Sequence, residues 1–168
     1  MLGLDLKEII TVGMVLFAVI DIIGSIPIII GLRAKFGHIE SEKASLVSGV
    51  IMITFLFIGE EILKLIGIDV NSFAVAGSFV LFFLALEMIL GIRIYRDEEA
   101  SSASIVPIAF PLIAGAGTMT TLLSLRSQFY TVNIIIAIIL NIIIVYIVLK
   151  SSSKIERMLG KNGLGVIR

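Results

Sequence analysis

Five long apolar stretches restrict this chain to very few folds. They cover residues 9–32, 46–66, 73–91, 105–125 and 132–149. About 20 residues of α-helix span the roughly 30 Å hydrocarbon layer of a bilayer, so each stretch is long enough to cross it. Helices are required because lipid offers no hydrogen-bond partner to a free backbone amide. The sequence therefore predicts an all-α integral membrane protein with five transmembrane helices.

The composition excludes several other classes of protein. Of the 168 residues, 58% are hydrophobic and 15% are charged, which is more apolar surface than one soluble core of this size can bury. The net charge is zero and the basic residues form no dense run with interleaved aromatics, so we expect no nucleic-acid partner. The chain has no cysteine, which excludes thiol chemistry. The lone histidine, His38, is expected to be solvated in a polar loop rather than to bind a metal.

Lys and Arg are divided unequally between the two sides of the predicted bundle. The connections at 33–43 and 93–104, with the tail after residue 149, hold 10 of the 13. The other side holds only Lys7, Lys64 and Arg126. Because positive charge is retained in the cytoplasm, this predicts a multi-pass protein of the plasma or inner membrane with its N-terminus outside.

The first apolar stretch carries residues that a lipid-facing helix avoids. Asp21 lies at its midpoint, where a carboxylate costs about 2.5–3.5 kcal/mol. Gly24 loosens the backbone, and Pro27 removes a helical amide and clashes with the preceding turn. The helix should therefore break at mid-membrane. A new half-helix should begin there, with Ser25 as its N-cap and Ile26 in its first turn.

The fourth stretch repeats this design. It contains two prolines, two glycines and a threonine, namely Pro107, Pro111, Gly115, Gly117 and Thr118. When residues 18–32 are aligned with residues 109–123, Gly24 falls on Gly115. The two copies are three spans apart, so they run in opposite directions, which is the signature of an inverted repeat with broken helices 1 and 4 at a mid-membrane substrate site. The alternative is a pair of proline kinks that serve helix packing.

Four motifs resemble those of the MarC family. They are DIIGSIP (21–27), AVAGS (74–78), VPIAFPLIAGAGT (106–118) and MLGKNG (158–163). The resemblance covers essentially the whole chain. It implies six membrane helices and, for members with known activity, transport of small neutral amino acids such as glycine and alanine. The chain departs from the family pattern at Asp21 and Ile22, where Asn-Pro is common, at Ser25, where Asn is frequent, and at Ala116, where proline is usual.

The resemblance also predicts the organisation of the repeats. Family members continue into a sixth helix, so we expect a 3+3 inverted repeat from which that helix is missing. Residues 1–91 would form the first three-helix repeat, and residues 92–168 a truncated second repeat of two helices and a basic tail. A chain of this kind is expected to pair with another copy, and a strictly monomeric species in detergent would contradict that expectation.

The two interruptions offer partners for a zwitterionic amino acid. Half-helix N-termini bind anions, so the amides at 24–26 and 117–119 are expected to hold the substrate carboxylate. Asp21 would then hold the ammonium group, carry a coupling proton, or bind Na⁺, and no other cofactor is expected. The candidate substrate-binding residues are Asp21, Gly24, Ser25, Ile26, Gly115, Gly117, Thr118 and Met119. Asn141 and Thr54 are candidates to line the pathway, although polar residues within spans more often join helices.

The chemistry of an intramembrane enzyme is not visible. An aspartyl protease needs two facing acids, but only Asp21 lies deep within a span. A serine protease needs a buried histidine base, but His38 lies in a loop. The sequence therefore predicts a secondary transporter of small neutral amino acids. The alternatives are a channel, although no charged ring or carbonyl filter is visible, and a structural membrane protein without transport activity.

Overall fold

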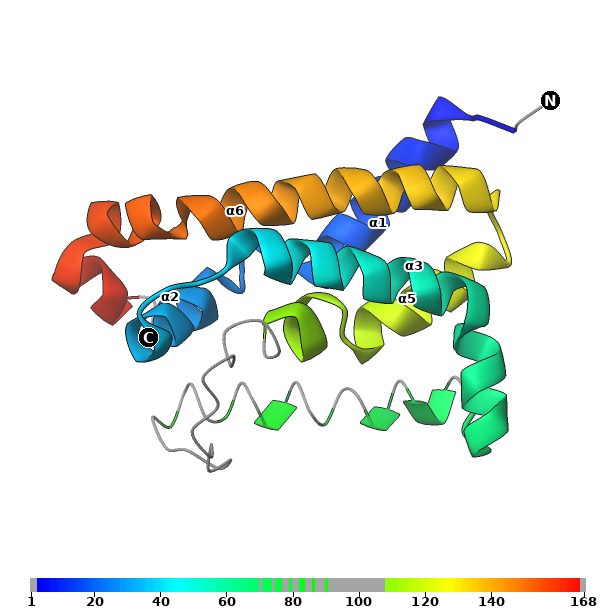
Figure 1. Cartoon of the computed structure of the whole chain (residues 1–168), viewed down its shortest axis with the longest axis horizontal. Coiled ribbons are helices and arrows are strands. Elements are labelled where there is room, and N and C mark those ends of the chain that lie inside the picture. Colours follow the sequence, from blue (N-terminus) through cyan, green and yellow to red (C-terminus); the bar gives the residue numbers. More distant parts are fainter. Residues whose placement is uncertain are drawn as a thin grey trace.

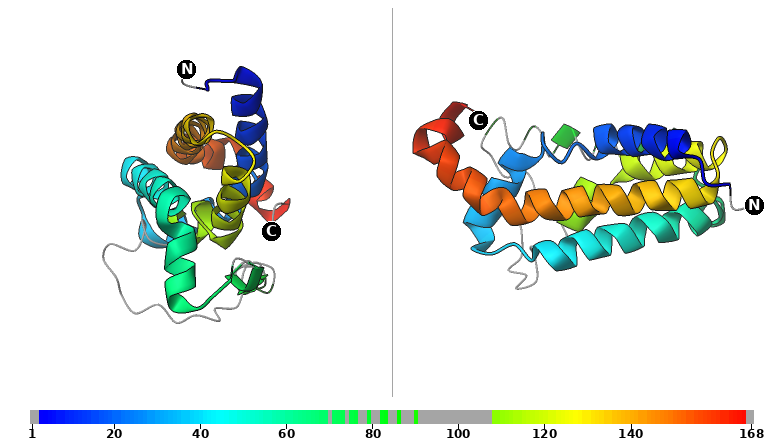
Figure 2. Two further views of the ribbon diagram at one scale, coloured as in Figure 1. Left: turned by 90° about the vertical axis from the view of Figure 1, so that its right-hand side faces the viewer. Right: turned by 90° about the horizontal axis from the view of Figure 1, so that it is seen from above.

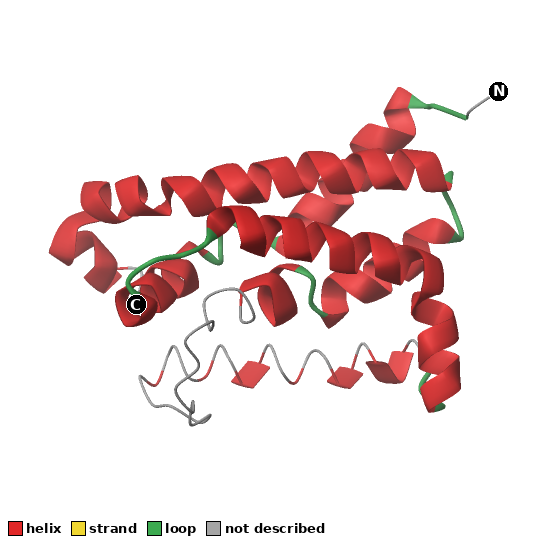
Figure 3. Cartoon of the chain, in the orientation of Figure 1, coloured by secondary structure: helices red, strands yellow, loops and turns green. Residues whose placement is uncertain are grey.

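The structure is a computed structural model that describes residues 3–69, 71–73, 75–76, 79, 82–83, 86, 90 and 108–166. Within these residues every regular element is a helix (Figures 1 and 3). In chain order they are α1 (Leu6–Ile20), α2 (Ile26–Phe36), α3 (Ser41–Ile66), the π-helical η1 (Ile108–Ile113), α5 (Ala116–Arg126) and α6 (Thr131–Val166). Most of the predicted span 73–91, and the predicted repeat boundary at 91, lie outside the described residues.

Two helices of the described part are long and apolar enough to cross a membrane without interruption. They are Ser41–Ile66 in α3 and Thr131–Ser152 in α6. The stretches 9–32 and 105–125 do not qualify as single helices, because each is divided into two helical pieces. The α6 helix also continues past the predicted end of its span at residue 149, so the basic tail extends this helix as far as Val166.

The first broken segment runs parallel to α6 along its whole length. Three side-chain hydrogen bonds join the two segments: Asn133 Nδ2 to the Gly3 carbonyl at 2.9 Å, Asn141 Nδ2 to the Gly13 carbonyl at 3.1 Å, and Arg33 Nη1 to Ser152 Oγ at 2.9 Å. Residue numbers rise together across these contacts, so α1 and α2 point the same way as α6. Figure 2 shows α1 lying alongside α6.

The α3 and α5 helices run in the opposite direction. Tyr146 of α6 donates to Glu42 at the start of α3, and Gly49 of α3 lies against Ile142 of α6, so α3 is antiparallel to α6. At the other end of the bundle, Arg126 in the last turn of α5 donates to the Leu56 and Phe57 carbonyls of α3, at 2.8 and 2.9 Å. The end of α5 therefore lies toward the end of α3, and the broken segment that contains η1 and α5 runs antiparallel to α1.

The described helices share one apolar core and leave many large apolar side chains on the outside. Leu16, Ile29, Met52, Leu122 and Ile138 are all fully buried. The exposed apolar residues lie mainly on α1, α3 and α6. An exposed apolar surface of this extent is suited to contact with lipid rather than with water.

Candidate functional site

The predicted break in the first segment occurs at Asp21. α1 ends at Ile20, and Asp21 caps it in the left-handed conformation, with φ 44° and ψ 49°. Residues other than glycine rarely adopt this conformation, but aspartate tolerates it because its short carboxylate can bond to nearby backbone. Here Oδ1 accepts the Gly24 amide at 3.1 Å. The mid-span carboxylate noted in the sequence is therefore part of the turn that separates α1 from α2, and its side chain is exposed rather than buried.

The amides at 24–26 are not free, contrary to expectation. Gly24 donates to the Asp21 side chain, Ser25 to the Asp21 carbonyl at 3.0 Å, and Ile26 to the Ile23 carbonyl at 3.1 Å. The turn is so short that each amide reaches an acceptor within it. Ser25 is buried at the N-cap position of α2, but its hydroxyl makes no capping bond. Its backbone is helical, whereas side-chain capping requires an extended N-cap residue.

Asp21 supplies a hydrogen-bond acceptor inside the turn that leads into α2. Asp21 is the C-cap of α1 and precedes the first residue of α2 by five positions, so its carboxylate is held by the Gly24 amide of the turn rather than by the dipole of α2. The residue is exposed, and among the described residues its Oδ2 atom has no hydrogen-bond partner. Gly24 is packed against this side chain, since a Cβ atom there would lie 2.8 Å from Asp21 Cγ. One carboxylate oxygen thus remains available to a cation.

The second break has the position predicted for it. Phe110 is extended, with φ −142° and ψ 127°, because the following residue is Pro111 and proline disfavours helical backbone before it. After η1, Gly115 is again extended, and α5 begins at Ala116 with Gly115 as its N-cap. The interruption centred on Gly115 is therefore confirmed as a break in the helix.

Thr118 bridges this second break. Its side chain is buried, and its hydroxyl donates to the Ile113 carbonyl at 2.9 Å across the interruption. Met119 is also buried, and its amide donates to the Gly115 carbonyl at 2.9 Å. The Met119 amide was expected to hold the substrate carboxylate, but this bond makes it unavailable. The Gly117 and Thr118 amides lie in the first turn of α5, where a helix provides no acceptor. Within the described chain they have no hydrogen-bond partner.

The two breaks lie next to each other. A Cβ atom on Gly117 would be 3.7 Å from Cγ1 of Val19, so the first turn of α5 touches the last turn of α1. At the far end of α1, a Cβ atom on Gly3 would be 3.2 Å from the ring of Tyr130, which follows α5. These contacts bring the open amides of α5 close to the segment that ends in Asp21.

The two candidate pathway residues occupy different environments. Asn141 is buried, and its amide donates to the Gly13 carbonyl of α1 at 3.1 Å and to the Ala137 carbonyl at 2.9 Å. This is a contact that joins two helices. Thr54 is exposed on α3.

One polar residue that the sequence pattern did not single out, Asn133, is fully buried at the start of α6. Its amide donates to the Glu8 carboxylate at 2.7 Å, and the same carboxylate accepts the Tyr130 amide at 3.3 Å. Its spacing to Asn141 could have indicated that both asparagines face the same neighbouring helix, because residues eight apart lie on similar faces of a helix. The two asparagines hold α1 against α6 at two levels.

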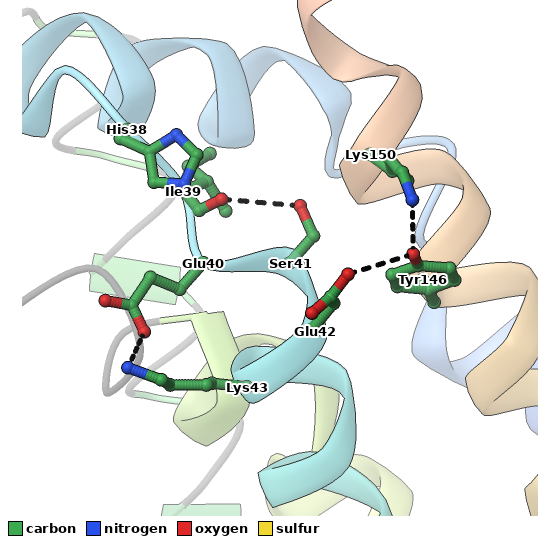
Figure 4. A pocket seen from close by; sticks show the side chains of 8 residues that line it. All are labelled: His38, Ile39, Glu40, Ser41, Glu42, Lys43, Tyr146 and Lys150. Carbon is green, nitrogen blue, oxygen red and sulfur yellow. Dashed lines mark hydrogen bonds and ion pairs between the residues drawn. The ribbon is translucent and has the colours of Figure 1, made fainter.

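A pocket of about 400 Å³ lies away from the breaks, where α3 begins beside α6 (Figure 4). Residues 38–43 line it together with Tyr146 and Lys150. His38 is exposed there. Among the residues that the structure describes, no cluster of three or more His, Cys, Asp or Glu side chains is placed to hold a metal ion.

Among known protein families, the one described as MarC family integral membrane protein matches residues 6–168 of this chain. A UPF0056 membrane protein of Pyrococcus abyssi is 34% identical over 160 residues, covering 90% of this chain and 80% of the relative. A UPF0056 membrane protein of Buchnera aphidicola subsp. Schizaphis graminum is 30% identical, covering 90% and 78%. The UPF0056 inner membrane protein YhgN of Escherichia coli is 27% identical, covering 96% and 87%. No solved structure matches the chain.

Proposed function

The chain belongs to the MarC family of integral membrane proteins, and we propose that it is a secondary transporter of small neutral amino acids rather than an enzyme. The observation that carries the proposal is the pair of broken helices, which lie antiparallel with their interruptions in contact at Val19 and Gly117. In transporters with inverted repeats, such helices meet at mid-membrane and form the substrate site.

The contacts along the bundle support the inverted relation between the two segments. The start of α1 lies beside Tyr130, just beyond the end of α5, and the end of α1 lies beside the start of α5. The segments therefore point in opposite directions with their breaks at one level. Packing kinks need no such match in depth, so this arrangement favours a 3+3 inverted repeat that spans the membrane.

The chemistry of the breaks divides the two charges of an amino acid between them. The Gly117 and Thr118 amides, at the positive end of the α5 dipole, bind the substrate carboxylate. At the other break Asp21 Oδ1 accepts the Gly24 amide, which leaves the Oδ2 atom of Asp21 to bind a cation. That cation is the substrate ammonium group in one version of the mechanism, and a coupling H⁺ or Na⁺ in the others.

Close packing at the site supports a preference for small substrates. A Cβ atom on Gly117 would lie 3.7 Å from Val19 Cγ1, an ordinary contact distance, so the space beside the α5 amides fits a methyl group before Val19 limits it. Glycine and alanine, the substrates implied by the family resemblance, meet this restriction.

The experiment is counterflow of labelled alanine in proteoliposomes. Uptake that saturates with concentration supports a carrier, linear flux would indicate a channel, and absence of flux would indicate a structural role. Asp21→Asn keeps the Oδ1 atom that accepts the Gly24 amide but removes the charge, so it should reduce exchange or abolish its dependence on H⁺ or Na⁺. Glu61→Gln is the matched control, because Glu61 is exposed near the end of α3. Uptake by Asp21→Asn with unchanged rate and ion dependence would exclude Asp21 from the mechanism.

We also propose that the N-terminus lies outside the cell and the basic tail in the cytoplasm. The distribution of Lys and Arg supports this orientation. A tag fused to the N-terminus should react with impermeant reagents added to intact cells. A tag that reacts only after the membrane is opened would reverse the orientation.

A further inference from the structure

The pocket between the start of α3 and α6 carries balanced charge. Lys43 and Lys150 contribute two positive charges to its lining, and Glu40 and Glu42 contribute two negative charges. Glu40 and Lys43 form an ion pair with an N–O distance of 2.5 Å. Figure 4 shows two charged groups, one on each side of the first turn of α3. The Glu40–Lys43 pair is on one side, and Glu42, Tyr146 and Lys150 are on the other. A pocket with both signs of charge suits a zwitterionic ligand better than an anionic one.

Tyr146 keeps two of these charges apart. Lys150 Nζ donates to the Tyr146 hydroxyl at 2.6 Å, and that hydroxyl donates to Glu42 Oε1 at 3.3 Å. Within the described residues, Glu42 and Lys150 form no direct ion pair. Lysine has three donors and a carboxylate has two oxygens, so each group can still bind a charge of opposite sign. A direct ion pair would have left both groups much less available.

The first turn of α3 adds donors to this arrangement. The Ser41 amide donates to the Ile39 carbonyl and the Ala44 amide to the Glu40 carbonyl. The two amides between them, those of Glu42 and Lys43, have no acceptor in the described chain. Open amides at the start of a 26-residue helix attract phosphate oxygens, and Lys150 lies beside them in the same pocket.

Apolar side chains continue from the pocket toward the middle of the membrane. On α3, Leu46 and Val50 follow Glu42 at intervals of one turn and are 67% and 56% exposed. On α6, Ile143 lies one turn from Tyr146 in the same direction and is 48% exposed. A polar mouth followed by exposed apolar surface has the polarity of a phospholipid, with its headgroup at the interface and its acyl chains alongside the helices.

The geometry points to a binding site for a zwitterionic phospholipid with a primary ammonium group, that is, phosphatidylethanolamine. Its phosphate binds Lys150 and the first amides of α3, and its ammonium group donates to Glu42. A free amino acid is also zwitterionic, but the pocket is larger than a glycine or alanine needs, since sites of roughly 300–1,000 Å³ hold much larger ligands. The inference is independent of the transport activity proposed above.

The test is native mass spectrometry of the full chain in detergent, with equal amounts of phosphatidylethanolamine, phosphatidylcholine and phosphatidylglycerol. Phosphatidylethanolamine should be retained in preference to both others. Phosphatidylcholine has the same charges but no N–H to donate to Glu42, and phosphatidylglycerol has no ammonium group. Glu42→Gln keeps the shape of the side chain and should lower this preference roughly fivefold, the scale of one exposed ion pair.

Two further variants separate binding from folding. Tyr146→Phe lets Glu42 and Lys150 approach each other, and should weaken retention of phosphatidylethanolamine. Glu61→Gln, at the opposite end of α3, should leave retention unchanged. Equal retention of all three lipids, or an unchanged preference in Glu42→Gln with wild-type thermal stability, would overturn the inference. Displacement of the lipid by an equal concentration of soluble phosphoethanolamine or alanine would overturn the assignment to lipid.

Discussion

The close contact between Gly24 and Asp21 predicts that two substitutions in the first break are strongly coupled. An alanine at position 24 would place its Cβ atom 2.8 Å from both Cγ and Oδ1 of Asp21, which is closer than such atoms approach in proteins. The carboxylate must then turn away, and its bond to the amide at position 24 is lost. If Asp21 is first replaced by glycine, there is nothing for the new Cβ atom to displace.

The magnitude follows from the contacts. A hydrogen bond to a charged group contributes about 1.5–3 kcal/mol, and the exposure of Asp21 places this one near 1.5 kcal/mol. Gly24 is not among the described glycines with positive φ, so alanine fits its backbone and recovers about 0.5–1 kcal/mol of chain entropy. Gly24→Ala should therefore destabilise the wild-type protein by about 0.5–1 kcal/mol. In the Asp21→Gly background it should stabilise by about the same amount.

The assay is equilibrium unfolding of the four proteins, wild type, two single variants and the double variant, in mixed micelles of dodecylmaltoside and sodium dodecyl sulfate. The expected coupling free energy is about 1.5 kcal/mol, roughly tenfold in the equilibrium constant. Effects that add within about 0.3–0.5 kcal/mol would refute the reasoning, because independent sites behave in this way. So would a Gly24→Ala effect of the same sign in both backgrounds.

Two other predictions concern bonds between helices. Asn141→Leu removes the donor to the Gly13 carbonyl and should cost about 0.6–1.7 kcal/mol in the same unfolding assay, whereas unchanged stability would show that this bond does not hold α1 to α6. Arg126→Met removes both donations to the Leu56 and Phe57 carbonyls and should cost about 1.5–3 kcal/mol by thermal unfolding in detergent. If Arg126→Met unfolds at the wild-type temperature, these two contacts contribute nothing.

The positions of the breaks were predictable because their causes are local. Pro27 and Pro111 disturb the backbone within one turn of their own positions, and Gly24 and Gly115 make the helical conformation beside them less stable. Such effects need no information about neighbouring helices. The same locality explains the long spans, since length and apolar composition alone qualify α3 and α6 as membrane helices.

Hydrogen-bond partners at the breaks were not predictable in the same way. Ser25 has the right residue type for an N-cap, but its backbone is helical and its side chain makes no capping bond, while Asp21 accepts the Gly24 amide one residue before it. The sequence did not indicate that the Thr118 hydroxyl would bridge to the Ile113 carbonyl across the interruption. In both cases the outcome depends on backbone angles in the turn, and residue type does not determine those angles.

The amino-acid sequence by itself determined that this is a helical membrane protein whose first and fourth apolar stretches are interrupted near their centres, because hydrophobic length and proline or glycine act within single helices. Only the tertiary structure decided that the breaks touch at Val19 and Gly117, that α1 runs parallel to α6, and that Tyr146 separates Glu42 from Lys150. Those facts depend on which faces of distant helices pack together, and many faces of these helices are apolar enough to do so.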